Sequence, residues 1–309
     1  MYKVFVSLAI SLLFAISASA SFLPPDLKID MKNLPVGPSN IDQNEFNQIL
    51  EDIRGIYSSK VSSVGGRLSL QGQWNNDKPN ARATQMFGTW RVEITGGLAR
   101  RPELTADGFA LIVCHELGHH MGGYAFAPTT PIPIPIPGIE DWAAAEGQSD
   151  YYATQVCARR IWGNDLNRNA EFRQTVSDEI RQQCDGVWQQ QDEQNLCYRT
   201  LAATESMIAT MAALMQVDMP SYSTPDTSVV DKTVTSHPQP QCRMDTSLQG
   251  ALCAVEFNDS VIPGKGNESG SGSADAERDA FRYSCSRYDN HAVGPRPQCW
   301  FKSQLAVNH

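Results

Sequence analysis

The feature that most constrains the fold of this 309-residue chain is an HExxH motif at residues 115–119, set in sequence typical of a helix. Thr105 can cap the start of that helix, and Gly122 and Gly123 can end it, so we expect a helix over residues 106–121. Apolar residues fill the turns before the motif. The motif is therefore expected on a helix that packs against the rest of the protein.

The two histidines of the motif have the spacing of metal ligands. Residues four apart share one face of a helix, so His115 and His119 can present imidazole nitrogens to one metal ion. Glu116 is rotated by about 100° from His115, beside the metal, where it can accept a proton from metal-bound water. A histidine pair without metal is the alternative, but it would leave two buried polar rings in need of partners. We predict one zinc ion per chain, with Glu116 as the catalytic base.

A catalytic zinc site needs a third protein ligand and an open position. Glu146 and Asp150 lie four apart in the next helical stretch, so both carboxylates face one way. We predict that Glu146 binds zinc and that Asp150 accepts a hydrogen bond from the far nitrogen of a ligating histidine. Surface acids on an amphipathic helix are the alternative, but the alanines at 143–145 indicate close packing against another helix.

The sequence before the motif predicts one helix and three strands. Asn40 or Asp42 can cap a helix whose apolar residues recur at helical spacing. Alternating residues and turn residues then predict strands at 67–74, 81–85 and 90–95. The last of these strands is a candidate edge to which an extended substrate could add.

After the motif the chain is mainly helical. Five prolines make the connection 124–141 extended, and its segment 131–137 is a candidate rim of the cleft. Helices are expected at 142–162, 165–184 and 196–217. The expected fold class is α+β, mainly helical with a small antiparallel sheet next to the HExxH helix.

The first twenty residues predict a secretory signal peptide. An apolar run from 4 to 16 follows Lys3, and Ala18-Ser19-Ala20 offers a cleavage site after Ala20. The run is too short to cross a bilayer core of about 30 Å. We therefore expect an exported protein, periplasmic or secreted, with no membrane anchor after cleavage. The net charge of −9 argues against a nucleic-acid partner.

The eight cysteines indicate disulfide bonds, because their number is even and the chain is expected to be exported. Their connectivity stays open. The simplest guess pairs neighbours in the sequence: Cys184–Cys197, Cys242–Cys253 and Cys285–Cys299. For Cys114 we expect a structural disulfide or a buried thiol.

Composition divides the chain after the signal peptide. Residues 21–40 are a proline-rich leader, and residues 41–250 are expected to form the metallopeptidase domain. Residues 251–309 are expected to be a cysteine-containing extension, with a Gly/Ser-rich segment at 264–273.

Several motifs in order resemble the CAAX-prenyl-protease type of gluzincin metallopeptidase, a family with soluble periplasmic members. Besides HExxH, the family's N-A-x-A, strand-G-L-L and E-x-x-x-D segments and its later S/T-H-P…R…L segment have counterparts. In this chain the counterparts are, in the same order, residues 80–83, 92–98 and 146–150, and Ser236-His237-Pro238 followed by Arg243 and Leu248. The resemblance covers roughly residues 45–250.

The resemblance implies a zincin-like fold and places His237 near the metal. There His237 would donate to an oxyanion or cap the zinc in a resting state, although a turn histidine before Pro238 is an equal alternative. Tyr151 and Tyr152 are other candidate oxyanion donors, and His120 is expected to face solvent or the next element. Arg82 stands where the family commonly has a large apolar residue, so substrate preference stays open.

The sequence thus predicts a zinc endopeptidase that hydrolyses peptide bonds of exported or misfolded proteins through a Glu-activated, zinc-bound water. Its partner would be a protein or peptide substrate. One alternative is a zinc-containing binding or chaperone-like protein of the cell envelope, without hydrolytic activity. Another is a disulfide scaffold in which HExxH is fortuitous.

Overall fold

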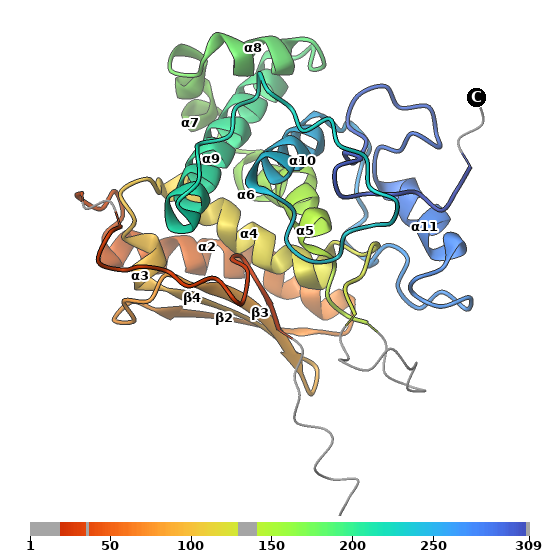
Figure 1. Ribbon diagram of the computed structural model, residues 1–309, viewed down its shortest axis with the longest axis horizontal. Helices are drawn as coiled ribbons and strands as arrows, with labels where there is room; N and C mark the ends of the chain where they lie inside the picture. The colour runs from red at the N-terminus through yellow and green to blue at the C-terminus, as the bar shows by residue number, and fades with distance from the viewer. Residues whose placement is uncertain (1–18, 35–36, 129–140, 307–309) are drawn as a thin grey trace, which may run out of the picture.

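The computed structural model describes residues 19–34, 37–128 and 141–306 (Figure 1). The apolar run of the predicted signal peptide lies outside the described residues, and so does segment 131–137. The last two residues of the predicted signal peptide are described, and they belong to the first strand.

Four strands form one sheet in the order β1-β3-β4-β2. Their bounds are β1 Ser19–Ser21, β2 Arg67–Gln73, β3 Ala81–Met86 and β4 Thr89–Thr95. The three strands predicted from the sequence are confirmed to within two residues at each end. β1 pairs antiparallel with β3, and β3 pairs antiparallel with β4.

The prediction of a wholly antiparallel sheet is wrong, because β2 and β4 are parallel. Phe87 and Gly88 join β3 to β4 with positive φ angles of 48° and 72°, the geometry of a tight hairpin. β3 therefore lies directly beside β4, and β2 takes the other side of β4. The expectation that residues 90–95 form a free edge is also wrong, since β4 pairs on both sides.

Two helices cover one face of the sheet (Figure 1). Helix α2 (Gln43–Ser63) begins at Asp42, whose side chain accepts hydrogen bonds from two backbone amides of the first turn. Helix α4 (Ala106–Met121) carries the HExxH motif and begins at Thr105, which accepts from the amide of Gly108. The short helix α3 (Gly96–Ala99) links β4 to α4. The helix predicted at 106–121 is confirmed.

The second helix of the predicted site begins later than expected. Helix α5 (Glu146–Tyr152) continues through a π-helical turn, η1 (Ala153–Cys157), into α6 (Ala158–Trp162). Residues 142–145 are not helical because their amides bond elsewhere: Ala144 donates to the carbonyl of His119, and Ala145 donates to that of Ala125. Glu146 is therefore the first residue of its helix.

Most of the remaining helices pack around one long helix, which itself contacts α4. The helix predicted at 165–184 is interrupted, because Ser177 caps a new helix. Helix α9 confirms the helix predicted at 196–217, whereas helix α10 was not predicted. The bounds are α7 Leu166–Glu171, η2 Phe172–Gln174, α8 Asp178–Asp185, α9 Gln191–Met215, α10 Pro240–Leu252, α11 Ala274–Ala280 and η3 Phe281–Tyr283. Helices α5 and α9 contact α4, and α10 contacts both α5 and α9 (Figure 1).

All eight cysteines form disulfides: Cys114–Cys157, Cys184–Cys197, Cys242–Cys299 and Cys253–Cys285. Of the three pairs guessed from proximity in sequence, only Cys184–Cys197 is correct. Cys242 and Cys253 stand at opposite ends of α10, so about 16 Å of helix separates them, beyond disulfide reach. The expected structural disulfide of Cys114 is confirmed, and it joins α4 to the helix that follows α5.

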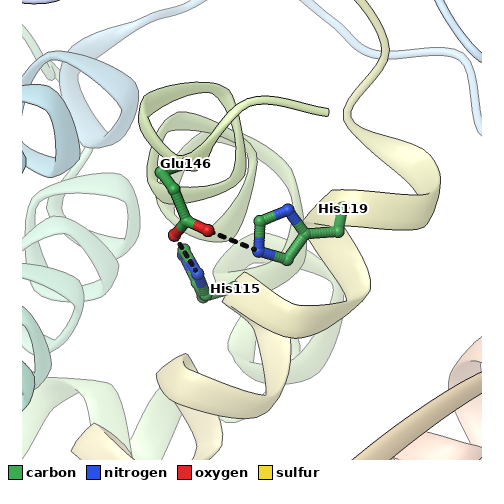
Figure 2. A group of neighbouring side chains, drawn as sticks. All are labelled: His115, His119 and Glu146. Atoms are coloured by element: carbon green, nitrogen blue, oxygen red, sulfur yellow. Dashed lines mark ion pairs between the residues drawn. The ribbon is translucent and has the colours of Figure 1, made fainter. Parts of the chain in front are cut away.

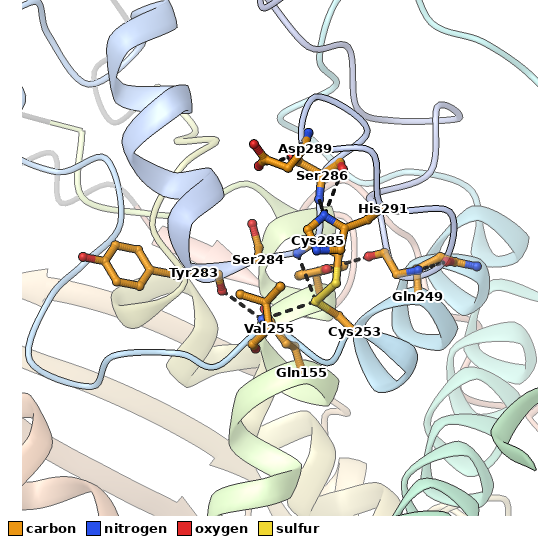
Figure 3. Close-up of a disulfide and its surroundings, with 12 residues drawn as sticks. Gln155, Gln249, Cys253, Val255, Tyr283, Ser284, Cys285, Ser286, Asp289 and His291 are labelled. Carbon is orange, nitrogen blue, oxygen red and sulfur yellow. Dashed lines mark hydrogen bonds between the residues drawn. A yellow bond between two sulfur atoms is a disulfide. The ribbon is translucent and has the colours of Figure 1, made fainter. Parts of the chain in front are cut away.

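The C-terminal residues pack against the helix that begins at Glu146. Beside the Cys253–Cys285 disulfide, Gln155 donates hydrogen bonds to the carbonyls of Val255 and Tyr283 (Figure 3). A side chain at Gly147 would collide with Trp300, since a Cβ atom there would lie 2.4 Å from the indole ring. In the described part of the chain, no helix is long and apolar enough to cross a membrane. The four disulfides are typical of an oxidising environment.

Candidate metal centre

Three side chains from two helices converge on one point (Figure 2). His115 and His119 come from the last turns of α4, and Glu146 comes from the start of α5. His115 Nε2 lies 3.3 Å from Glu146 Oε2, and His119 Nε2 lies 3.6 Å from Glu146 Oε1. The candidate ligand atoms of the three residues lie within 4.8 Å of one another, so the group could hold a metal ion.

The outer nitrogen of each imidazole is held by a hydrogen bond. His119 Nδ1 lies 2.8 Å from the carbonyl oxygen of Ala144, and His115 Nδ1 lies 2.8 Å from Asp150 Oδ1. A carbonyl oxygen only accepts, so the proton of His119 is on Nδ1 and the lone pair of Nε2 faces Glu146. His115 takes the same tautomer when it is neutral. Second contacts of this kind orient metal-binding histidines.

The converging atoms have no hydrogen-bond partner among the described residues. This holds for Nε2 of both histidines and for Oε2 of Glu146. All three side chains are at most 4 % exposed, and polar atoms buried this deeply normally have partners. A metal ion at this point would satisfy all three atoms together.

A buried guanidinium supports Asp150. Arg243 on α10 donates to both carboxylate oxygens of Asp150, at 2.7 and 2.8 Å. Both side chains are fully buried. The sequence places Arg243 in the family-like segment but does not indicate a role for it. Its role depends on how α10 packs on α5, and α10 itself was not predicted.

The buried charges of the centre leave room for a divalent cation. Glu116, Glu146 and Asp150 bring three carboxylates, and Arg243 brings the one guanidinium that faces them. With neutral histidines and three ionised acids, two negative charges would stay uncompensated in a site shielded from water. Without a metal, the raised pKa values of His115 and Glu116 keep protons in the centre that offset this excess. Uncompensated buried charge is costly, and an ion of charge +2 would balance it. The donor set and the charge therefore fit a divalent metal.

The pKa values of the three candidate ligands point the same way. Burial by itself lowers the pKa of His115, but the charge and hydrogen bond of Asp150 outweigh it and raise the pKa to about 9. Burial raises the pKa of Glu146, but the charges of the two histidines bring it well below its ordinary range. Burial lowers the pKa of His119 to about 4. The ionised Glu146 and Asp150 therefore favour positive charge between them, which either a proton on His115 or a bound cation supplies.

Glu116 is buried beside the candidate ligands. Its carboxylate oxygens have no hydrogen-bond partner among the described residues. Burial raises its pKa to about 8, the charge of Glu146 acts in the same direction, and the backbone amide of Phe22 acts against them. A carboxyl group with a pKa in this range can both accept and return a proton near neutral pH.

His237 lies beside the carboxylate of Glu146. Its Nε2 is 3.4 Å from Glu146 Oε1 and 2.7 Å from the carbonyl oxygen of Ser21. Burial lowers the pKa of His237, so the ring is neutral near pH 7 and donates its Nε2 proton to that carbonyl. The histidine that the resemblance placed near the metal therefore does lie beside the candidate ligands.

The two tyrosines weighed as oxyanion donors point away from the centre. The hydroxyl of Tyr151 donates to the carbonyl of Gly294 at 2.6 Å, and that of Tyr152 donates to the hydroxyl of Tyr57 at 3.3 Å. Both groups are committed elsewhere in the core. This leaves His237 as the candidate donor.

His120 does not face solvent. Its ring is buried and stacks between Trp90 and Trp142, with centroid distances of 5.4 and 4.9 Å. The alternative expectation, that it faces the next element, is confirmed. Its position is structural, since it fills the space between α4 and the sheet.

The two ligand helices approach closely at a glycine. A Cβ atom at Gly118 would lie 2.9 Å from the backbone of Ser149, closer than normal contacts allow. The hydroxyl oxygen of Ser149 lies 2.9 Å from His119 Nδ1. The glycine inside the HExxH motif therefore lets α5 bring Glu146 within reach of both histidines.

Comparisons of this chain with protein-family models, with curated proteins and with solved structures found no match. His115, His119 and Glu146 form a buried group that could hold a metal ion, which is compatible with a metalloenzyme.

Proposed function

We propose that this protein is a zinc-dependent endopeptidase. The observation that carries the proposal is the convergence of two imidazole nitrogens and one carboxylate oxygen, without other partners among the described residues, beside the buried carboxyl group of Glu116. Three protein ligands of this kind are typical of catalytic zinc sites, which keep a fourth position open. A structural zinc site is usually closed by four protein ligands and has no use for a base.

The metal would supply Lewis acidity, which polarises a carbonyl group and makes a water molecule acidic near neutral pH. Glu116 accepts the proton of the attacking water and later returns it to the leaving amine. Its raised pKa suits both transfers. Because its oxygens are otherwise without partners among the described residues, the group is available to reacting atoms.

The other residues of the centre would position these groups. Asp150 and Arg243 hold the ring of His115, and Ala144 and Ser149 hold that of His119. His237 is placed to donate a hydrogen bond to a carbonyl oxygen beside Glu146, as it does to Ser21. Such a donor stabilises negative charge as it develops on that oxygen.

The metal identity and the setting are part of the same proposal. Nitrogen and carboxylate donors in a set of three suit zinc better than the harder ions, which prefer oxygen ligands alone. The four disulfides fit a protein that works outside the reducing cytosol. We propose that it is exported and that its substrates are exported or misfolded proteins.

The test is a comparison of wild type with Glu116→Gln. Zinc content is measured by metal analysis, and proteolysis is measured with unfolded casein. We expect about one zinc per chain in both proteins and a fall in activity of about 10²- to 10⁴-fold in Glu116→Gln. Glu45→Gln, an exposed change in the first turn of α2, is the matched control and should match wild type.

Two results would contradict the proposal. Equal degradation by wild type and Glu116→Gln would favour a zinc-containing binding protein without hydrolytic activity. Absence of stoichiometric zinc from the purified protein would favour a fortuitous motif in a disulfide scaffold.

A further inference from the structure

The segment of residues 19–23 crosses the candidate metal centre. Its first part, β1, adds to the edge of β3, with Ala20 opposite Ala83 and Ser21 opposite Arg82. The amide of Phe22 continues this ladder by donating to the carbonyl of Ala81 at 3.1 Å. The segment is therefore an extended peptide that uses the edge of the sheet as its binding surface.

Two residues of the centre bind the backbone of this segment. His237 Nε2 donates to the carbonyl of Ser21, and Arg243 Nη1 donates to the carbonyl of Phe22, both at 2.7 Å. His237 Nε2 is also 3.4 Å from Oε1 of Glu146, so the Ser21 carbonyl lies next to the candidate ligands.

The side chain of Phe22 completes the contact. It is fully buried and meets the ring of His115 edge-on, with the centroids 5.8 Å apart. The guanidinium of Arg243 lies 5.2 Å from the centre of the Phe22 ring. The aromatic side chain therefore packs directly against one candidate ligand and against Arg243.

These contacts have the form that a peptide substrate needs. Addition to a sheet edge fixes an extended chain through backbone hydrogen bonds. The carbonyl of Ser21, held by His237 beside Glu146, brings the backbone of the segment next to the candidate ligands. A surface cavity of about 530 Å³ runs on from the segment and is lined by residues that include Leu23, Asn80 and Arg82.

We propose that residues 19–23 occupy the substrate-binding groove as an internal pseudo-substrate and hold the centre closed. This inference rests on the proposed peptidase function. It also defines the substrate class: an extended segment with a small residue at the place of Ser21 and a bulky apolar residue at the place of Phe22. The contacts to His237 and Arg243 come from Ser21 and Phe22, which a cut after Ala20 would leave in the chain.

Tethering makes such a segment an effective competitor. A peptide joined to its own binding site acts at an effective concentration of the order of millimolar. A substrate of similar intrinsic affinity but lower concentration would be excluded until the segment leaves the edge of β3. Opening would require only the loss of a short strand and one aromatic contact, while the disulfide-linked helices stay in place.

The first test compares Phe22→Ala with Phe87→Ala in the zinc-loaded protein. Phe87 is 94 % exposed in the β3–β4 hairpin, so the same change there is a matched control. The measurements are the rate of zinc transfer to a coloured chelator and the rate of casein cleavage. For Phe22→Ala we expect both rates to rise about tenfold, because the local opening becomes easier, and for Phe87→Ala we expect wild-type rates. Equal rates in all three proteins would overturn the inference.

The second test supplies the segment as a separate peptide, and its wild-type arm does not depend on how well Phe22→Ala folds. A synthetic peptide of residues 19–25 is added to wild type and to Phe22→Ala. We expect it to slow zinc transfer from Phe22→Ala and to inhibit casein cleavage, whereas the same peptide carrying Phe22→Ala should do neither. Equal effects of the two peptides would overturn the inference.

The outcomes separate this inference from the proposed function. If the peptidase proposal alone fails, Phe22→Ala will lose zinc faster but no variant will cleave casein. If the pseudo-substrate alone fails, cleavage will depend on Glu116 but will not change in Phe22→Ala.

Discussion

The two sides of the candidate metal centre are built differently. On the helix side, α4, α5 and α10 hold His115, Asp150 and Arg243 through buried ion pairs, and the Cys114–Cys157 disulfide braces the helices. On the strand side, β1 is three residues long and is fixed by the edge of β3 and by His237, and Arg243 contacts the residue that follows it, Phe22. One side is suited to holding a metal, and the other is suited to moving.

The largest effect that would test this contrast is expected from Arg243→Met. The change leaves the buried carboxylate of Asp150 without its guanidinium, and breaking a buried pair in this way costs about 3–5 kcal/mol. Urea unfolding of the zinc-loaded protein would measure the loss. Arg243→Lys keeps the charge but not the bidentate geometry, so its free energy of unfolding should lie between those of wild type and Arg243→Met. A loss in Arg243→Met below about 1 kcal/mol, the level of an exposed pair, would mean that the helix side is not the rigid side.

His237→Gln tests the strand side. If His237 donates to the carbonyl of the substrate, its removal should lower kcat/KM by roughly 10²-fold, the usual effect of losing one such donor. Zinc content should stay unchanged, because His237 is not one of the three candidate ligands. His291→Gln, in the C-terminal loop shown in Figure 3, is the matched control. Loss of zinc together with activity would instead make His237 a metal ligand.

Asp150→Asn tests whether Asp150 supports the metal-binding position of His115. The amide keeps the shape of the side chain but loses the charge that raises the pKa of His115. Replacing such a supporting group typically weakens metal affinity 10- to 100-fold, and competition with a zinc chelator would measure it. Asp245→Asn on α10 is the control, because Asp245 binds the backbone amide of Asp226 away from the centre. Unchanged zinc affinity in Asp150→Asn would contradict the supporting role.

The sequence predicted the helix side better than the strand side, for a physical reason. A helix carries its own geometry, so the spacing of His115 and His119 and the caps around them fix which side chains share a face. Glu146 and Asp150 could be paired in the same way. The positions of these four residues depend on local periodicity, which a sequence displays directly.

The strand side depends on contacts between distant parts of the chain. Ser21 meets His237 across 216 positions, and Arg243 meets Phe22 across 221. Which strand forms the edge of a sheet depends on the hairpin at Phe87 and on the segment that adds to β3. The disulfides follow the same rule. Only Cys184–Cys197, which has the shortest sequence separation, could be predicted from proximity in the sequence.

The smallest expected effect comes from Arg82→Ala, on the rim of the proposed groove. Arg82 pairs with Glu93 at 2.7 Å, but half of its side chain is exposed, and exposed pairs contribute about 0–1 kcal/mol. We expect the free energy of unfolding, measured in urea, to change by less than about 1 kcal/mol. Zinc affinity should stay at the wild-type value. Arg82 lies opposite Ser21 and lines the cavity beside the segment, so its loss should alter which residues a substrate can present there. Cleavage of a peptide library, with wild type beside Arg82→Ala, would measure the change in preference. An altered cleavage preference at unchanged stability would indicate that substrates bind along the edge of β3. An unchanged preference would indicate that they bind at another surface.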